Sequence, residues 1–283
     1  MKKEFENALN ELLNLKVSDQ ESAAKFNQLF KQMVTASMQI CGETDYSSLV
    51  QQKIDESEKK FGVKMGDSDE TDPYKKMREL VRFEMYRETV LNDVEHEVCC
   101  TESNLDSAMA KFRSELEKIV PQSQPEVVQS MGYSLYSNFT KFMVNTVMDM
   151  VADAKIYQME EFRPLQLNAL GKELRSYVNA IRQQNAKPQK SQTVTNWFTS
   201  MMILPCFLFK KLYGVSMAEM FEAPQKIVDQ TAHMFNIFDK ASHPFSVGSE
   251  YMILKEFLDE LNLSDSFTVR IKMKKTDDGK ILN

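Results

Sequence analysis

The sequence contains little glycine and proline: eight of each among 283 residues, about half of what average usage would supply. These two residues form most tight turns, so their scarcity disfavours many-turned β-sandwiches, collagen-like repeats and low-complexity segments. Long helices joined by short polar connections are the remaining expectation. The hydrophobic content of 42% and the charged content of 27% are those of an ordinary globular protein.

Cysteine is also scarce. The four thiols are too few for a disulfide framework, and no Cys-x-x-Cys spacing connects them, so the plainer interpretation is a reducing compartment. No hydrophobic run reaches the ~18 residues of a membrane-spanning helix, the longest being 197–209. Charges recur through the first residues, where a secretory signal would be apolar. We therefore expect an intracellular protein, cytoplasmic or nuclear, without a transmembrane segment.

Known catalytic signatures are missing. The sequence has no Gly-rich phosphate loop, no Gly-x-Ser-x-Gly elbow and no His-Glu-x-x-His pair. Only three histidines are available for acid–base chemistry, and one of them, His233, stands four residues after Asp229. Such a pair on one helix face is more often a surface hydrogen bond than a catalytic dyad. We therefore predict no enzymatic activity, no cofactor and no metal.

One cluster comes close to a metal site or a reactive thiol. His96, Cys99 and Cys100 follow Asp93 at spacings that would bring them to one side of a helix. Three ligands within one turn rarely complete a tetrahedral set, however, and adjacent cysteines point about 100° apart on a helix. Buried thiols beside a partly exposed histidine are the alternative that we favour.

Apolar residues recur at helical spacing along most of the chain. The residues from Ser18 to Glu21 are typical of a capping box, and Asp72-Pro73 is typical of the start of a helix. The helix expected from Pro125 has apolar positions on more than one stripe, so we predict that it runs through the middle of the bundle. The predicted helices cover approximately 5–13, 19–42, 46–61, 73–98, 103–120, 125–162, 164–184, 195–213 with an interruption at Pro205, 225–238 and 250–261.

The end of the chain changes period. Phe267, Val269, Ile271 and Met273 alternate with polar residues, which predicts a β-strand. One strand cannot form a sheet alone, so it should pair with the short remnant 280–283, with another chain, or with nothing. The predicted fold is an all-α, irregular multi-helix bundle of about ten helices with a short C-terminal β-strand or hairpin. We divide the chain into a helical domain, 1–262, with a subdivision near 185–192, and a strand-like tail, 263–283.

Charge is unevenly distributed. The range 43–106 holds 17 acidic and 9 basic residues, whereas the range 163–214 holds 8 basic residues and the single acid Glu173. The two regions could neutralise each other within the fold or across a dimer. The second region could instead bind an acidic protein partner or an anionic membrane surface.

The longest apolar run falls inside this basic region. Its bulky residues and the lysines that follow define a candidate partner- or membrane-binding segment, comprising Trp197, Phe198, Phe207, Phe209, Lys210 and Lys211. A run that is apolar on all sides is, however, more often a central core helix. Nucleic acid is a weaker candidate, because aromatic residues are not interleaved with lysine at single-strand spacing.

From these features we predict a non-enzymatic intracellular interaction protein, an adaptor or complex subunit that binds other proteins through helical surfaces and its C-terminal strand. The alternative from a different class is a peripheral membrane or lipid-binding protein that uses the segment 197–211. The sequence does not define the oligomeric state.

Overall fold

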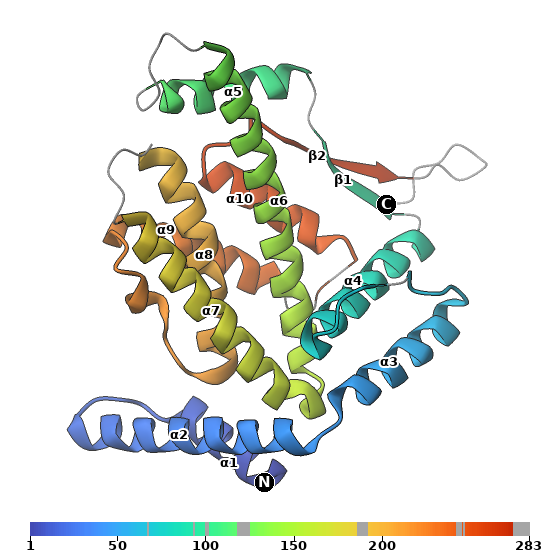
Figure 1. The fold of residues 1–283 in the computed structure, drawn as a ribbon, viewed down its shortest axis with the longest axis vertical. Helices are drawn as coiled ribbons and strands as arrows, with labels where there is room; N and C mark the ends of the chain where they lie inside the picture. The colour runs from blue at the N-terminus through green and yellow to red at the C-terminus, as the bar shows by residue number, and fades with distance from the viewer. Residues whose placement is uncertain are drawn as a thin grey trace. The chain divides into compact units, whose positions relative to one another are not determined.

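The computed structural model describes residues 1–66, 68–92, 94–99, 102–117, 125–185, 192–241, 245 and 247–273. Over these ranges the chain forms a multi-helix bundle of ten α-helices, as predicted, together with two 3-10 turns and two strands (Figure 1). The elements are α1 (Lys2–Asn14), α2 (Gln20–Glu43), α3 (Tyr46–Phe61), α4 (Pro73–Leu91), β1 (Val94–Cys99), α5 (Glu102–Leu116), α6 (Pro125–Tyr157), η1 (Glu160–Phe162), α7 (Arg163–Asn185), α8 (Gln192–Tyr213), η2 (Ala218–Phe221), α9 (Gln225–Ala241), α10 (Ser249–Glu260) and β2 (Thr268–Met273).

The contacts divide the chain into two compact units, each built from separate stretches of sequence. Unit 1 contains Met1–Glu84, Ala152–Tyr177 and Cys206–Met217, and unit 2 contains Met85–Val151, Val178–Pro205 and Ala218–Asn283. Four helices, α4, α6, α7 and α8, contribute residues to both units. The chain passes from unit 2 to unit 1 at Pro205, which lies inside α8 without ending it. The predicted interruption there is therefore wrong, and the predicted linker residues 186–191 lie outside the described ranges.

Unit 1 begins with an antiparallel pair, α1 and α2, whose boundaries follow from local chemistry. Asp19 caps α2 by accepting a hydrogen bond from the Ser22 backbone N–H at 2.8 Å, and the Ser22 hydroxyl accepts from the Asp19 N–H at 3.0 Å. This reciprocal cap is one residue later than the predicted one. α1 lies against the end of α8, where Gly214 has φ +72°, and a Cβ there would stand 2.3 Å from a methyl carbon of Leu12. Only glycine fits that position without strain.

Unit 2 has an aromatic and aliphatic core of its own. The side chains of Phe112, Phe139, Met143 and Phe257 are fully buried in it. The segment after α10 is tied to α5, because Lys111 donates to the carbonyl of Asn262 and pairs with the carboxylate of Asp265. The aromatic ring of Tyr136 stacks on that of Phe267 at 4.9 Å between centroids.

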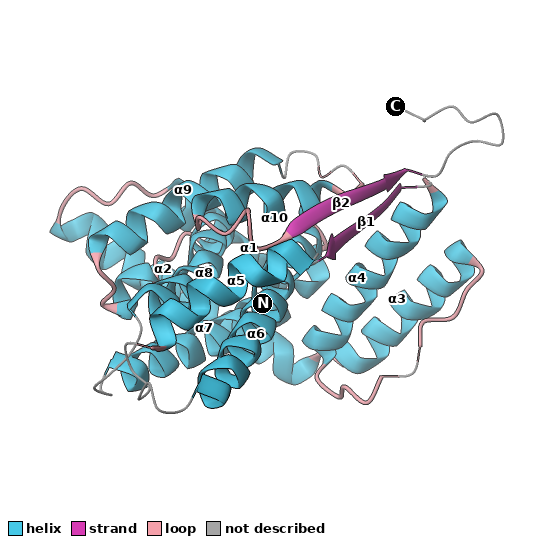
Figure 2. Cartoon of the chain, turned by 90° about the horizontal axis from the view of Figure 1, so that it is seen from above, coloured by secondary structure: helices cyan, strands magenta, loops and turns pink. Residues whose placement is uncertain are grey.

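The single helix predicted over 73–98 is wrong beyond Leu91. α4 ends at Leu91, and Val94–Cys99 forms β1, which pairs antiparallel with β2. Figure 2 shows the two strands as the magenta pair beside α10. Val94 and Val98 are four residues apart, a spacing that fits both a helix face and one side of a strand, so the apolar pattern alone was ambiguous.

Other element ends also differ from the predicted ones. The long helix α6 stops at Tyr157, and η1 follows it. The 3-10 turn η2 stands between α8 and α9. α5 ends at Leu116, and residues 118–120 of the helix predicted over 103–120 lie outside the described residues.

Candidate functional site

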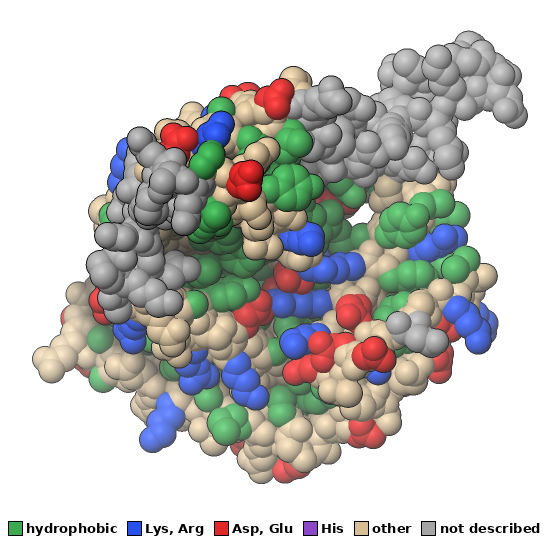
Figure 3. Space-filling model, turned by 45° about the horizontal axis from the view of Figure 1, so that its top comes forward, with side chains coloured by type: hydrophobic (Ala, Val, Ile, Leu, Met, Phe, Trp, Pro, Cys, Tyr) green, Lys and Arg blue, Asp and Glu red, His purple; other side chains and the backbone are tan. Residues whose placement is uncertain are grey.

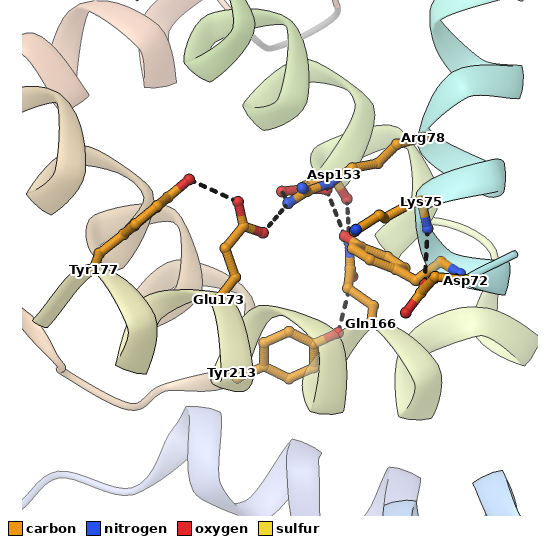
Figure 4. A network of polar contacts seen from close by, with 9 residues as sticks. Asp72, Lys75, Arg78, Asp153, Gln166, Glu173, Tyr177 and Tyr213 are labelled. Carbon is orange, nitrogen blue, oxygen red and sulfur yellow. Dashed lines mark hydrogen bonds and ion pairs between the residues drawn. The ribbon is translucent and has the colours of Figure 1, made fainter. Parts of the chain in front are cut away.

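A buried polar network occupies unit 1 and joins side chains from four helices (Figure 4). Its centre is Asp153 on α6, whose carboxylate is 2% exposed. Arg78 on α4 binds it in bidentate fashion, with Nε 2.7 Å from Oδ1 and Nη2 2.8 Å from Oδ2. The hydroxyl of Tyr74, one turn earlier on α4, donates to the same Oδ1 at 2.5 Å. Spacing of four residues places Tyr74 and Arg78 on one helix face, so both reach Asp153 together.

Arg78 also binds a second carboxylate. Its Nη2 lies 2.9 Å from Oε2 of Glu173 on α7, and the hydroxyl of Tyr177 donates to the other Glu173 oxygen at 2.8 Å. One guanidinium therefore stands between two carboxylates, each of which accepts a further hydrogen bond from a tyrosine. The planar fork of arginine, with five N–H donors, suits this bridging position.

Gln166 on α7 extends the network toward α8. Its amide nitrogen donates to the backbone carbonyl of Asp153 at 2.8 Å and to the Tyr74 hydroxyl at 3.1 Å. Its amide oxygen accepts from the Tyr213 hydroxyl at 2.9 Å. Both N–H groups and the carbonyl oxygen of this fully buried amide are thus engaged.

Burial controls the electrostatics of the network. It raises the pKa of Asp153 above the ordinary aspartate value, while the ion pair with Arg78 and the hydrogen bond from Tyr74 act in the opposite direction. Burial and the nearby Asp153 charge likewise raise the pKa of Tyr74 well above its usual range. Tyr74 therefore remains a neutral hydrogen-bond donor at physiological pH.

The polar groups of the network bind one another across four helices. Both oxygens of Asp153, and every polar group of the Gln166 amide, already bind protein groups. What the arrangement does is fix α4, α6, α7 and α8 against one another within unit 1.

The predicted segment 197–211 is largely packed inside. Trp197 is 8% exposed, and its ring lies 5.3 Å from that of Phe112 and 5.9 Å from that of Phe139 in unit 2. Phe198 is half-buried and stacks on Phe142 at 5.8 Å. The core-helix interpretation therefore describes the Trp197 end of the segment, and the surface interpretation of Trp197 is corrected, because the ring contacts other aromatic rings.

The second half of the segment belongs to unit 1. Phe209 is buried against Tyr213, with 5.2 Å between ring centroids, and Phe207 is half-buried. Lys210 and Lys211 are exposed in the last turn of α8, where positive charge is favourable at the negative end of the helix dipole. The six residues are thus divided between two units, and only the two lysines among them are exposed.

His96 and Cys99 belong to the strand β1 rather than to a helix, so the helical spacing considered for the His96 cluster does not apply. Asp93 and Cys100 lie outside the described residues. Within the described ranges, no group of three or more His, Cys, Asp or Glu side chains is arranged to hold a metal ion. The predicted pairing of Asp229 with His233 is also replaced: Asp229 accepts from Gln225, and His233 lies 3.0 Å from Glu260.

An exposed apolar stripe on α6 is the surface feature that sequence reasoning missed. Val127 is 43% exposed and Met131 is 40% exposed, and half-buried Leu135 continues the same line at four-residue spacing. We call these three residues the α6 stripe. The neighbouring face of α6, with Val128, Tyr136 and Phe139, is buried in unit 2. The helix predicted to run through the middle of the bundle therefore has a second, exposed apolar face in its N-terminal half.

Charge on the visible surface is mixed. On the face drawn in Figure 3, hydrophobic side chains lie among Lys or Arg and Asp or Glu side chains. Across the described residues, no helix is both long enough and apolar enough to span a membrane. Comparison with family models, with curated proteins and with solved structures finds no match for this chain.

Proposed function

We propose that this chain is a non-enzymatic protein-interaction module, an adaptor or a subunit of an assembly, which binds partner proteins through helical surfaces and through its C-terminal strand. The α6 stripe is the observation that carries the proposal. A single exposed apolar residue is ordinary on a protein surface, but a continuous line on a helix that is already apolar on its inner face is typical of a contact surface. Partner helices commonly bind such lines at four-residue spacing.

The polar network in unit 1 supports the same proposal. Its donors and acceptors are directed at one another, which stabilises a fixed arrangement of helices. The burial of Trp197 and Phe209 disfavours the lipid-binding alternative, since inserted aromatic anchors must reach the headgroup region. That the basic residues Lys210 and Lys211 contribute to binding an acidic partner stays a prediction.

The proposal is tested by affinity capture from extract of the source cells. We expect the Val127→Glu/Met131→Glu variant to recover at least one partner protein in an amount tenfold or more below that recovered by the unaltered chain. The reason is that the substitutions place two charges in an apolar contact. The matched control is Gln129→Glu/Ser130→Glu, which adds the same charge at exposed positions of the same helix. Far-UV circular dichroism and thermal unfolding check that both variants fold. An identical set of captured proteins for all three chains would contradict the proposal.

A further inference from the structure

The register of the two strands pairs opposite charges. Glu95 of β1 stands opposite Lys272 of β2, and Glu97 stands opposite Arg270. Directly opposite residues are the nearest cross-strand neighbours in an antiparallel pair, and opposite charges at such positions are favourable. Both acids lie on β1 and both bases lie on β2, so each strand carries one sign at these positions.

Two of the three intervening positions pair apolar residues. Val94 stands opposite Met273 and Val98 stands opposite Val269, while His96 stands opposite Ile271. Successive residues of a strand belong to alternate faces, so charged pairs fall on one face of the ribbon and these pairs fall on the other. β1 therefore favours a partner with apolar residues opposite Val94 and Val98 and basic residues opposite Glu95 and Glu97.

The ribbon has only two strands over the described residues, and α10 contacts both of them. A two-stranded ribbon has little stability of its own, because few cross-strand pairs oppose the entropy of ordering it. An equivalent strand from another molecule would form the same backbone hydrogen bonds with β1 that β2 forms. Whether β2 or a strand of another molecule pairs with β1 therefore depends on two factors. These are how well the side-chain pattern of each strand complements β1, and the effective concentration of each strand near β1.

We propose that β1 is a strand-acceptor site for an extended segment that alternates apolar and basic residues, and that β2 occupies this site within the same chain. The inference deepens the proposed interaction function, on which it rests, by naming the chemistry of one partner. A second copy of β1 is a poor occupant, since antiparallel pairing centred on His96 would place Glu95 opposite Glu97. The incoming strand must therefore be basic.

The test uses the full chain and a fluorescently labelled peptide with the sequence from Ser266 to Met273. Arg270→Glu/Lys272→Glu places like charges opposite each other within the chain and so frees β1. We expect this variant to bind the peptide at least tenfold more tightly than the unaltered chain in fluorescence anisotropy, with weaker binding at high salt. A peptide in which both bases are replaced by glutamate should not bind.

A charge-swapped control separates pairing from general damage. Glu95→Lys/Glu97→Arg combined with Arg270→Glu/Lys272→Glu restores opposite charges, so its β1 should again be occupied and reject the natural peptide. If the double variant does not fold, Lys272→Glu alone, which keeps one pair, should give intermediate affinity. Equal binding by the unaltered and altered chains, or equal binding of both peptides, would overturn the proposal. Those outcomes leave the α6 stripe untouched, whereas unchanged capture by the α6 stripe variant contradicts the proposed function.

Discussion

At the residue scale, Arg78 is a centre of charge in unit 1, because its guanidinium binds the carboxylates of both Asp153 and Glu173. We expect Arg78→Met to lower the free energy of unfolding by about 3–5 kcal/mol, since Asp153 would remain buried without its counter-charge. Urea unfolding measures this change. Lys53→Met is the matched control, because it removes an exposed ion pair with Glu56 in the same unit and should leave stability unchanged. If both variants lower the free energy of unfolding by the same amount, the buried network stabilises the protein no more than an exposed ion pair does.

Glycine positions provide a second comparison at this scale. Gly214→Ala should destabilise the protein by more than about 1 kcal/mol, because the left-handed backbone disfavours a Cβ and Leu12 already fills the space. Gly42→Ala should instead stabilise it by about 0.5–1 kcal/mol, because Gly42 lies within α2 and nothing stands within 4 Å of an added Cβ. In thermal unfolding, we expect Gly214→Ala to lower the melting temperature and Gly42→Ala to raise it. A melting temperature that does not fall in Gly214→Ala would contradict the need for glycine at position 214.

The sequence predicted little of the residue-scale detail. Tyr74 and Arg78 lie one turn apart on a predicted helix, but Asp153 and Glu173 are far away in the chain, so no local pattern connects them. The sequence does place two ionisable residues, Tyr74 and Arg78, among positions predicted to be buried, which indicates that each needs a polar partner. Partners for such residues come from tertiary packing, which a single sequence does not reveal.

At the element scale, the segment after α10 is held to α5 by Asp265. Hydrogen bonds from Lys111 and Ser107 lower the pKa of this carboxylate. A lowered folded-state pKa means that the contact stabilises the protein above the ordinary aspartate pKa of about 4 and is lost as pH falls through the lowered value. Asp265→Asn should therefore reduce the melting temperature near neutral pH, and the difference from the unaltered chain should vanish toward pH 2. A difference that stays constant with pH would contradict this role.

Helices were more predictable than strands for a physical reason. The helices from α1 to α3 have sharp apolar periodicity and recognisable ends, so their approximate ranges followed from the sequence. The sequence predicts a helix where β1 forms, because the four-residue spacing of Val94 and Val98 fits both the helical period and the strand period. The alternation of Val94, Glu95, His96, Glu97 and Val98 does contain the strand signal, and its acids complement the bases of β2. Charge complementarity between distant segments was the usable clue.

At the scale of the whole molecule, the composition correctly indicated a helical bundle but not its division into two units. Pro205 was expected to interrupt a helix, whereas α8 continues through it and contributes to both units. Discontinuous units arise when helices distant in sequence pack together, which linker composition does not reveal. The same limit applies to α6, because an apolar second face predicts burial whether another helix of the chain or a partner covers it.

The most direct test of the interaction claim places a photo-crosslinking amino acid on α6 in extract of the source cells. With the crosslinker at position 131 of the α6 stripe, we expect a discrete covalent adduct with another protein. With the crosslinker at position 129, exposed on the same helix but outside the stripe, the adduct should be at least several-fold weaker. No adduct from position 131, or equal adducts from both positions, would contradict the claim that this helix face binds a partner.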